Sequence, residues 1–266
     1  MTTLQAPWFG RWSAGAILAL AAGTAPVWAM QPLVTDDSGT QGQGGQQLEL
    51  AYQFDRARAG GKTSRTHTVP LTYTYGATGT LDLFVQPGYT YQEGGARGLG
   101  NTVVGAKWRF YGDADSGTSL ALKPELALPV SARREGEGLG TGRASGALTL
   151  ILSQQVPFGF VHVNAGVERD RFRPALDQPN ETHWRLSAAP VWNVSQEWKL
   201  ALDVGLESVH LGGQTQRSRF VQVGAIYSPS AALDLALGLT RQRTREPGEA
   251  GRTQTTSTTA GATWHF

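Results

Sequence analysis

The most regular alternation of apolar and polar positions lies at the end of the chain. Residues 255–266 alternate strictly, so that Ala260, Ala262, Trp264 and Phe266 share one face with two threonines. Strict period-two alternation predicts a β-strand with one apolar face. A strand at a chain terminus tends to fray unless other structure ties it down. We therefore expect this strand to close a ring of strands within a bilayer.

The same alternation recurs through residues 46–266. Leu81, Leu83 and Val85 share one face of a predicted strand, and Leu235, Leu237 and Leu239 share one face of another. The pattern predicts about twelve strands of about 9 to 13 residues, the length that a tilted strand needs to cross a bilayer. Apolar positions at helical spacing are not found in this region.

The segments that connect the predicted strands alternate in length. Short turns are predicted at residues 76–80, 112–117, 156–157, 195–196 and 228–231, and longer polar loops at residues 57–65, 93–100, 131–142, 170–182, 211–218 and 242–253. Outer-membrane barrels have short periplasmic turns and longer external loops. The sequence therefore predicts an all-β fold, a transmembrane antiparallel up-and-down β-barrel over residues 46–266 with both termini periplasmic.

Four prolines fall inside the predicted strands, at Pro70, Pro87, Pro124 and Pro190. Proline has no backbone N–H to donate to the neighbouring strand, and a closed barrel has no free edge where it could lie. We therefore expect β-bulges at these positions.

The N-terminal residues have the parts of a secretory signal. Arg11 precedes the apolar run at residues 14–22, and residues 27–29 form a small-x-small cleavage site. Residues 1–29 are therefore predicted to be a cleaved signal peptide, and the mature chain to begin at Met30 in the cell outer membrane. Residues 30–45 are predicted to be a periplasmic lead-in or plug. Asp36 and Asp37, with glycines close behind, could belong to a plug, a metal-binding loop or a solvated lead-in.

The cysteine content, net charge and histidine positions exclude several classes of site and partner. The absence of cysteine excludes thiol catalysis and disulfides. The formal net charge of +2 falls to about +1 without the presequence, so no nucleic-acid partner is expected. The five histidines lie on different predicted strands without ligand spacing, so neither a metal nor another cofactor is predicted.

The polar faces of the predicted strands are expected to point into the barrel lumen, because an Arg or Lys facing lipid costs about 2–4 kcal/mol at the midplane. Two interpretations remain open: a charged constriction that selects solutes, or a network of paired charges that fills the interior. The candidate lumen-lining residues are Glu49, Asp82, Gln86, Lys107, Arg109, Lys123, Glu125, His162, Asn164, Glu168, Arg185, Asn193, Lys199, Asp203, Glu207 and Asp234.

A lipid-face hydrolase is the enzymatic alternative. Ser208 and His210 are two residues apart on one predicted strand, so both side chains project outward. A serine nucleophile also needs a third group that orients its base. The sequence offers no obvious third group, and we expect no enzymatic activity.

Arginines are frequent in the predicted external loops. They include Arg133, Arg134, Arg169, Arg171, Arg173, Arg217, Arg219, Arg241, Arg243, Arg245 and Arg252. The guanidinium group matches phosphate geometry. Contact with lipopolysaccharide phosphates and an ordinary solvated loop surface are both consistent with this pattern.

Two segments resemble a known family of outer-membrane proteins. Residues 32–45 read PLVTDDSGTQGQGG and lead into Gln47-Leu48-Glu49-Leu50; residues 98–101 and 105–110 read GLGN and GAKWRF. They resemble the family named for the MetA pathway of phenol degradation, with Asn101 where an Asp is usual and Trp108 where a Tyr is usual. The ending at residues 261–266 also fits that family.

The resemblance implies a channel or transporter for small solutes, aromatic or hydrophobic ones among them. The expected mechanism is passive diffusion through the lumen. The alternative is a plugged structural or lipopolysaccharide-binding barrel. The expected partners are outer-membrane lipid, lipopolysaccharide, a small-molecule solute and the barrel-assembly machinery. The last is expected because the end of the chain resembles closing strands whose C-terminal Phe, here Phe266, is read by that machinery.

Overall fold

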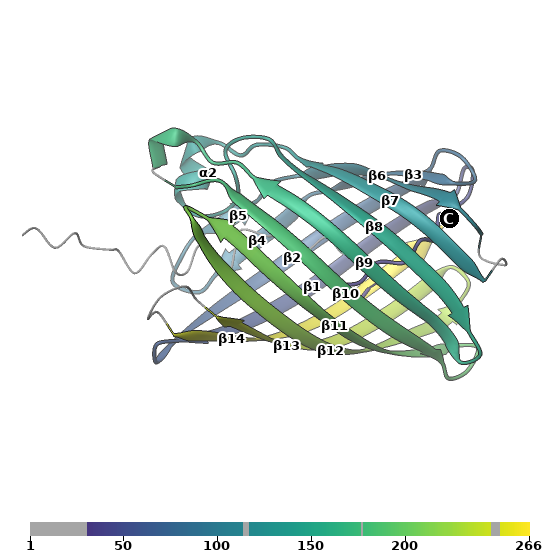
Figure 1. The fold of residues 1–266 in the computed structure, drawn as a ribbon. Helices are drawn as coiled ribbons and strands as arrows, with labels where there is room; N and C mark the ends of the chain where they lie inside the picture. The colour runs from purple at the N-terminus through teal and green to yellow at the C-terminus, as the bar shows by residue number, and fades with distance from the viewer. Residues whose placement is uncertain (1–30, 114–116, 177, 246–250) are drawn as a thin grey trace, which may run out of the picture.

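The protein is a single antiparallel sheet closed into a barrel (Figure 1). The computed structural model describes residues 31–113, 117–176, 178–245 and 251–266, so the predicted signal peptide lies outside the described residues. β1 (Gln46–Ala59) pairs with both β2 (Lys62–Gly76) and β14 (Arg252–His265), which closes the ring. The predicted barrel of 12 antiparallel strands is confirmed.

Two of the 12 barrel strands are interrupted. One consists of β3 (Leu81–Gln86) and β4 (Gly88–Gln92), and the next of β5 (Arg97–Leu99) and β6 (Val103–Tyr111). The remaining strands are β7 (Thr118–Ala127), β8 (Ser145–Val156), β9 (Gly159–Asp170), β10 (Glu181–Asn193), β11 (Trp198–Leu211), β12 (Gln214–Ser230) and β13 (Leu233–Arg245).

The prediction of β-bulges at the four prolines is wrong, because the strand register does not shift at any of them. β2 keeps one register with β3 and β4 across Pro87, which separates these two strands. Opposite Pro124, the β6–β7 pairing resumes at Trp108↔Leu122 in the register of Gly105↔Glu125, and the strands around Pro70 and Pro190 behave in the same way. At each proline, one or two residue pairs between neighbouring strands are missing, but the register is the same on either side. The alternation of inner and outer faces is therefore kept.

Two of the predicted long loops are also wrong. Residues 57–65 and 211–218 form strand ends joined by the two-residue turns Gly60-Gly61 and Gly212-Gly213. All four glycines have φ between +53° and +81°, the left-handed conformation that tight hairpin turns need and that glycine adopts without strain. These hairpins therefore extend the wall instead of ending in loops.

The barrel is apolar outside and polar inside. Outward side chains of β11–β13 such as Leu206, Val223 and Leu237 are 61%, 54% and 61% exposed, while Asp82 and Asp203 are fully buried. An apolar surface that surrounds a polar interior is stable only when lipid covers the outside. Among the described residues, no helix is long and apolar enough to span a membrane.

The two ends of the barrel differ. Gln47 pairs with His265, so β1 begins and β14 finishes at the same end, here called the terminal end. The aromatic pairs Trp198–Tyr227 and Phe158–Trp192, with ring centroids 4.7 and 5.5 Å apart, lie there. The opposite, loop end carries α2 (Ala132–Gly136), whose first turn is capped by the Ser131 hydroxyl, and the short 3-10 helix Pro174–Leu176 (Figure 1).

Candidate functional site in the barrel lumen

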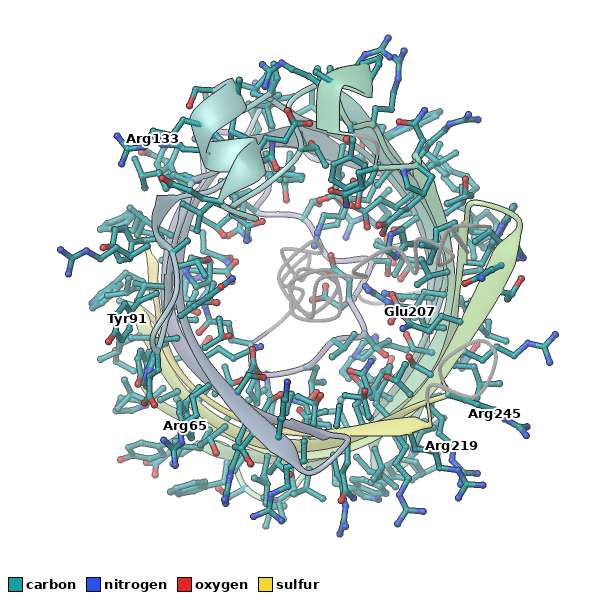
Figure 2. The ribbon with its side chains drawn as sticks, turned by 90° about the vertical axis from the view of Figure 1, so that its left-hand side faces the viewer. Arg65, Tyr91, Arg133, Glu207, Arg219 and Arg245 are labelled. Atoms are coloured by element: carbon teal, nitrogen blue, oxygen red, sulfur yellow. The ribbon has the colours of Figure 1, made fainter. Side chains whose placement is uncertain are left out.

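Residues 31–45, here called the inner segment, fold back into the barrel ahead of β1. Leu33 and Thr35 are fully buried, and Asp36 and Ser38 nearly so. Figure 2, which looks along the barrel from the loop end, shows this purple segment inside the ring of strands. The sequence left open whether residues 30–45 are a lead-in or a plug. The described part of the segment is held inside the lumen.

One anchor of the inner segment is Asp203 on β11. Its carboxylate accepts hydrogen bonds from the backbone N–H groups of Val34 and Thr35 at 2.8 and 2.7 Å, and from the Thr35 hydroxyl at 2.7 Å. The Thr35 hydroxyl also lies 2.8 Å from Ser187 Oγ on β10. A buried carboxylate that accepts several hydrogen bonds fixes the backbone that donates them.

A second anchor of the inner segment is the ionic contact of Asp36 with two lysines of the wall. The Asp36 carboxylate accepts from Lys123 Nζ at 2.8 Å and lies 3.5 Å from Lys107 Nζ. Burial by itself would raise the pKa of Asp36, but the attraction of Lys107 and Lys123 lowers it below the usual carboxyl value. Asp36 is therefore the centre of a buried charge cluster that joins the inner segment to β6 and β7.

The wall is shaped to receive the start of the inner segment. Gly224 on β12 and Gly238 on β13 are cross-strand partners, and a Cβ on either would lie 2.9 Å from Pro32. The Pro32 carbonyl accepts from Gln222 Nε2 at 2.5 Å. Because these two glycines have no side chains, Pro32 can pack directly against the backbone of the inner wall. We call this pair of residues the glycine strip.

The other contacts of the inner segment continue around the wall. Ser38 N donates to Ser153 Oγ at 2.9 Å, its hydroxyl lies 2.5 Å from Ser119 Oγ, and Gln41 N donates to Asp82 at 3.1 Å. The segment therefore contacts most of the circumference of the barrel, from β3 to β14.

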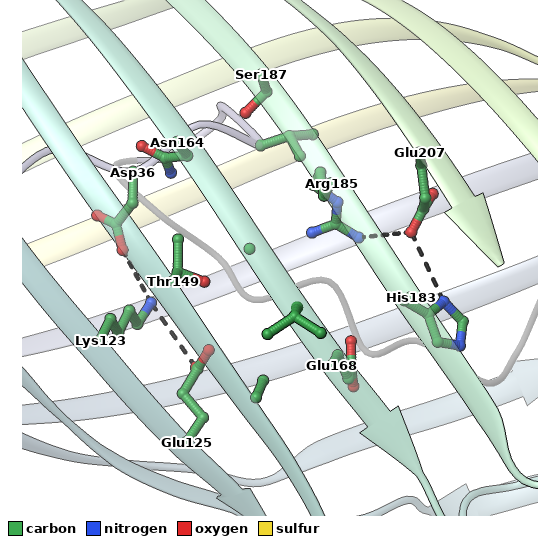
Figure 3. A pocket seen from close by; sticks show the side chains of 14 residues that line it. Asp36, Lys123, Glu125, Thr149, Asn164, Glu168, His183, Arg185, Ser187 and Glu207 are labelled. Carbon is green, nitrogen blue, oxygen red and sulfur yellow. Dashed lines mark hydrogen bonds and ion pairs between the residues drawn. The ribbon is translucent and has the colours of Figure 1, made fainter. Parts of the chain in front are cut away.

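The inner segment divides the lumen into two cavities. The cavity toward the loop end has a volume of about 40 Å³, and Glu168, His183 and Glu207 are among its lining residues (Figure 3). The cavity toward the terminal end has a volume of about 340 Å³ and contacts Glu49, Asp82 and Lys107. Asp36 and Lys123 line both cavities, so this ion pair lies at the boundary between them.

The candidate residues fall into three groups by burial. Those buried inside the barrel are Glu49, Asp82, Gln86, Lys123, Glu125, His162, Asn164 and Asp203. Those half-buried are Lys107, Arg109, Glu168, Arg185, Lys199, Glu207 and Asp234. Asn193 is exposed at the end of β10.

The structure brings some of these residues together. Arg185 donates to Glu207 at 3.1 Å, and Lys123 Nζ lies 3.9 Å from Glu125 as well as beside Asp36. Asp234 contacts His265 at 3.0 Å near the terminal end. Arg109 contacts none of the other candidates by a hydrogen bond in the described residues and donates to the Gly79 carbonyl.

Several residues of the site were missed in the sequence. Thr35, Ser38, Ser119, Ser153 and Ser187 hold the inner segment, but small hydroxyl residues carry no sequence signal for this role. Asp170, Glu181 and His183 form a buried group, and the first two were assigned to a loop. His183 alternates in phase with Arg185, so strand parity could have found it.

Asn101 holds the loop end together. Its side-chain Nδ2 donates to the carbonyls of Leu128 and Thr141 at 2.7 and 2.9 Å, and its Oδ1 accepts from Thr141 N at 2.7 Å. A carboxylate could not donate the first two bonds. The amide at this position therefore ties the long β7–β8 connection to the chain between β5 and β6.

The family model described as "Putative MetA-pathway of phenol degradation" matches residues 29–258. The chain belongs to this family. The match includes the inner segment and nearly all of the barrel. No curated protein sequence matches the chain.

Solved structures share the fold of this MetA-pathway family member at low sequence identity. An outer membrane channel from Pseudomonas putida F1 is 16% identical with a TM-score of 0.62, over 86% of this chain and 98% of that one. The β domain of the Bordetella autotransporter BrkA is 14% identical with a TM-score of 0.56, over 84% and 100% of the two chains. The translocator domain of NalP from Neisseria meningitidis is 12% identical with a TM-score of 0.53, over 85% and 89%. The barrel is thus of the outer-membrane type, which agrees with its apolar exterior.

Proposed function

We propose that the protein is an outer-membrane channel in which small solutes diffuse passively past the inner segment through a charged lumen. The observation that carries this proposal is the pair of cavities that share Asp36 and Lys123. Charged side chains that line a passage select solutes by polarity and sign. In this proposal the loop end faces the outside of the cell.

The size and lining of the larger cavity favour small polar or aromatic solutes. An apolar cavity of about 150 Å³ is enough to hold benzene, and the cavity toward the terminal end has about 340 Å³. Its lining includes Glu49, Asp82 and Lys107, which can hydrogen-bond a hydroxyl or carboxylate substituent. The family description and the Pseudomonas putida channel support the same class of function.

Purified protein in a planar bilayer is expected to give discrete single-channel events of low conductance, because the inner segment leaves only narrow space in the lumen. Measurement in a KCl gradient gives both the conductance and, from the reversal potential, the preferred ion. Detergent without protein is the control. A complete lack of events over a wide voltage range, with the barrel shown to be folded by circular dichroism, would exclude a conducting channel.

A second proposal concerns the outer surface, where arginines gather above the apolar belt. Arg217 and Arg219 on β12 pair directly with Arg245 and Arg243 on β13, and Arg245 also pairs with Arg252 on β14. All five side chains are exposed and alternate in phase with outward residues such as Val221 and Leu239. Figure 2 shows Arg219 and Arg245 projecting away from the wall. We name these five residues the arginine patch.

Like charges directly opposite each other on neighbouring strands repel. In the described residues, no ion pair compensates the five arginines of the patch. Anions from the surroundings can relieve this repulsion, and phosphate matches the guanidinium fork. We propose that the arginine patch binds the phosphate groups of lipopolysaccharide in the outer leaflet.

Replacing Arg219, Arg243 and Arg245 with Gln is expected to lower the amount of lipopolysaccharide that co-purifies with the barrel, since three of five phosphate-binding groups are lost. The measurement is phosphate and lipid analysis of the purified protein. Arg133→Gln is the matched control, because Arg133 is exposed at the same end but pairs with Glu137 at 2.9 Å. Equal lipopolysaccharide content in the triple variant and the control would contradict the proposal.

The outward pair Ser208 and His210 does not form a catalytic arrangement. Ser208 lies opposite Arg217 and Trp184, and no hydrogen bond joins it to His210 within the described part of the chain. We therefore propose a non-enzymatic protein, since a serine nucleophile needs its base within hydrogen-bond reach.

A further inference from the structure

Three buried side chains meet near the loop end of the lumen. Asp170 ends β9 and Glu181 begins β10, where the two residues are cross-strand partners, and His183 follows two residues later on the same inner face. The three residues are only 2%, 6% and 6% exposed. Each offers one ligand atom, and the three atoms lie within 4.8 Å of one another.

Two of the three distances match those between ligands of one metal ion. His183 Nε2 lies 3.2 Å from Glu181 Oε2 and 3.5 Å from Asp170 Oδ2. Zn²⁺ binds imidazole nitrogen and carboxylate oxygen at about 2.0–2.2 Å in a tetrahedron, whose ligand atoms are then about 3.3 Å apart. The three atoms could therefore bind one Zn²⁺ with little movement.

The second nitrogen of the imidazole faces a supporting carboxylate. His183 Nδ1 lies 3.8 Å from Glu207 Oε1, and Glu207 accepts from Arg185 at 3.1 Å (Figure 3). Histidines that bind a metal usually donate their other ring N–H to a carboxylate, which fixes the ring and its tautomer. Glu207 is placed for this role, and Arg185 holds Glu207.

Two polar atoms of the group have no hydrogen-bond partner. Asp170 Oδ2 and His183 Nδ1 are both buried without one among the described residues, and Asp170 Oδ2 is the atom that points toward His183 Nε2. The surroundings are also rich in negative charge, since Asp170, Glu181 and Glu207 lie within ion-pair distance of the imidazole, and Glu168 lines the same cavity. A bound cation would balance this excess of buried carboxylates.

We infer that Asp170, Glu181 and His183 bind a divalent cation of the Zn²⁺ type, with a fourth position open to the lumen. One imidazole and two carboxylates suit Zn²⁺ better than Mg²⁺ or Ca²⁺, which prefer oxygen ligands only. The site lies beside the cavity that contains the Asp36–Lys123 boundary and at the base of the β9–β10 connection. Bound Zn²⁺ would therefore fasten that connection to the wall of the lumen.

The test uses the full barrel after treatment with a chelator. Titration calorimetry with ZnCl₂ is expected to show one bound ion per chain, and Co²⁺ is expected to give the visible absorption of a four-coordinate site. Excess Zn²⁺ should raise the unfolding temperature by about 5 °C or more. His183→Gln and Glu181→Gln are each expected to abolish these three effects.

His162→Gln is the matched control, because His162 is an equally buried histidine of the lumen whose Nδ1 contacts the Ser153 hydroxyl. This variant should bind Zn²⁺ as the unmodified protein does. Absence of stoichiometric binding to the unmodified protein, or unchanged binding in both Glu181→Gln and His183→Gln, would overturn the inference. Since the readouts are binding and stability, they are independent of whether the barrel conducts.

Discussion

Deleting residues 32–40 is expected to raise the single-channel conductance severalfold, because these residues carry most contacts of the inner segment in the middle of the lumen. The deletion removes three sets of contacts together: the hydrogen bonds that Asp203 accepts, the Asp36–Lys123 ion pair and the hydrogen bonds of Ser38. The two cavities then join into one passage. Conductance in planar bilayers measures the effect, with circular dichroism to verify the strand content.

A Gly/Ser replacement of residues 32–40 at equal length is the control for this deletion. It keeps the chain length but lacks the specific contacts, so we expect frequent transitions between low and high conductance. An unchanged conductance in the deletion variant, with the barrel intact, would show that the inner segment does not limit the passage. The channel proposal itself would survive that result, since it is tested by the conductance of the unmodified protein.

Lys123→Met is expected to destabilise the barrel by about 3 kcal/mol, since removing one partner leaves the other charges buried and uncompensated. Lys123 is 5% exposed and contacts both Asp36 and Glu125, which are themselves buried. Lys107 at 3.5 Å from Asp36 compensates only part of the loss. The free energy of unfolding, measured by urea titration in lipid vesicles, reports the change.

A double-mutant cycle separates the ion pair from the packing of the lysine. Asp36→Asn combined with Lys123→Met is expected to cost less than the sum of the two single changes, because the two groups are in contact. Lys199→Met is the control: Lys199 is a half-buried lysine of the lumen for which the described residues contain no ion pair. A Lys123→Met variant as stable as Lys199→Met would contradict the role of the cluster.

The barrel itself could be predicted because each strand repeats one simple rule. Period-two alternation placed Leu235, Leu237 and Leu239 outside and residues such as Asp203 inside, and the structure agrees with both assignments. The rule works because lipid and water impose opposite requirements on the two faces of every strand. Local chemistry was less reliable. Prolines were expected to force bulges, but losing one or two backbone pairs is tolerated when the strands on either side hold the register.

The candidate site could be predicted only in part. Strand parity identified Lys123, Arg185 and Glu207 as inward residues, but not which of them meet. The inner segment has no periodicity, and its partners lie far along the chain: Thr35 and Asp203 are 168 residues apart. Asp170 and Glu181 fall in the predicted loop at residues 170–182 because the residues there are mostly polar. In a barrel whose strands continue past the membrane, polar strand ends resemble loops.

The glycine strip that receives Pro32 has a consequence for the order of folding. The inner segment precedes every strand in the chain, yet its seat includes Gly224 and Gly238, and Gly261 on β14 lies against Gln31. The separation of Pro32 and Gln222 by 190 residues makes this one of the longest loop closures in the protein. This contact surface is complete only after β14 has formed, since Gly261 belongs to it. The inner segment is synthesised before every strand, and it is therefore expected to bind to the wall last, after the barrel has closed.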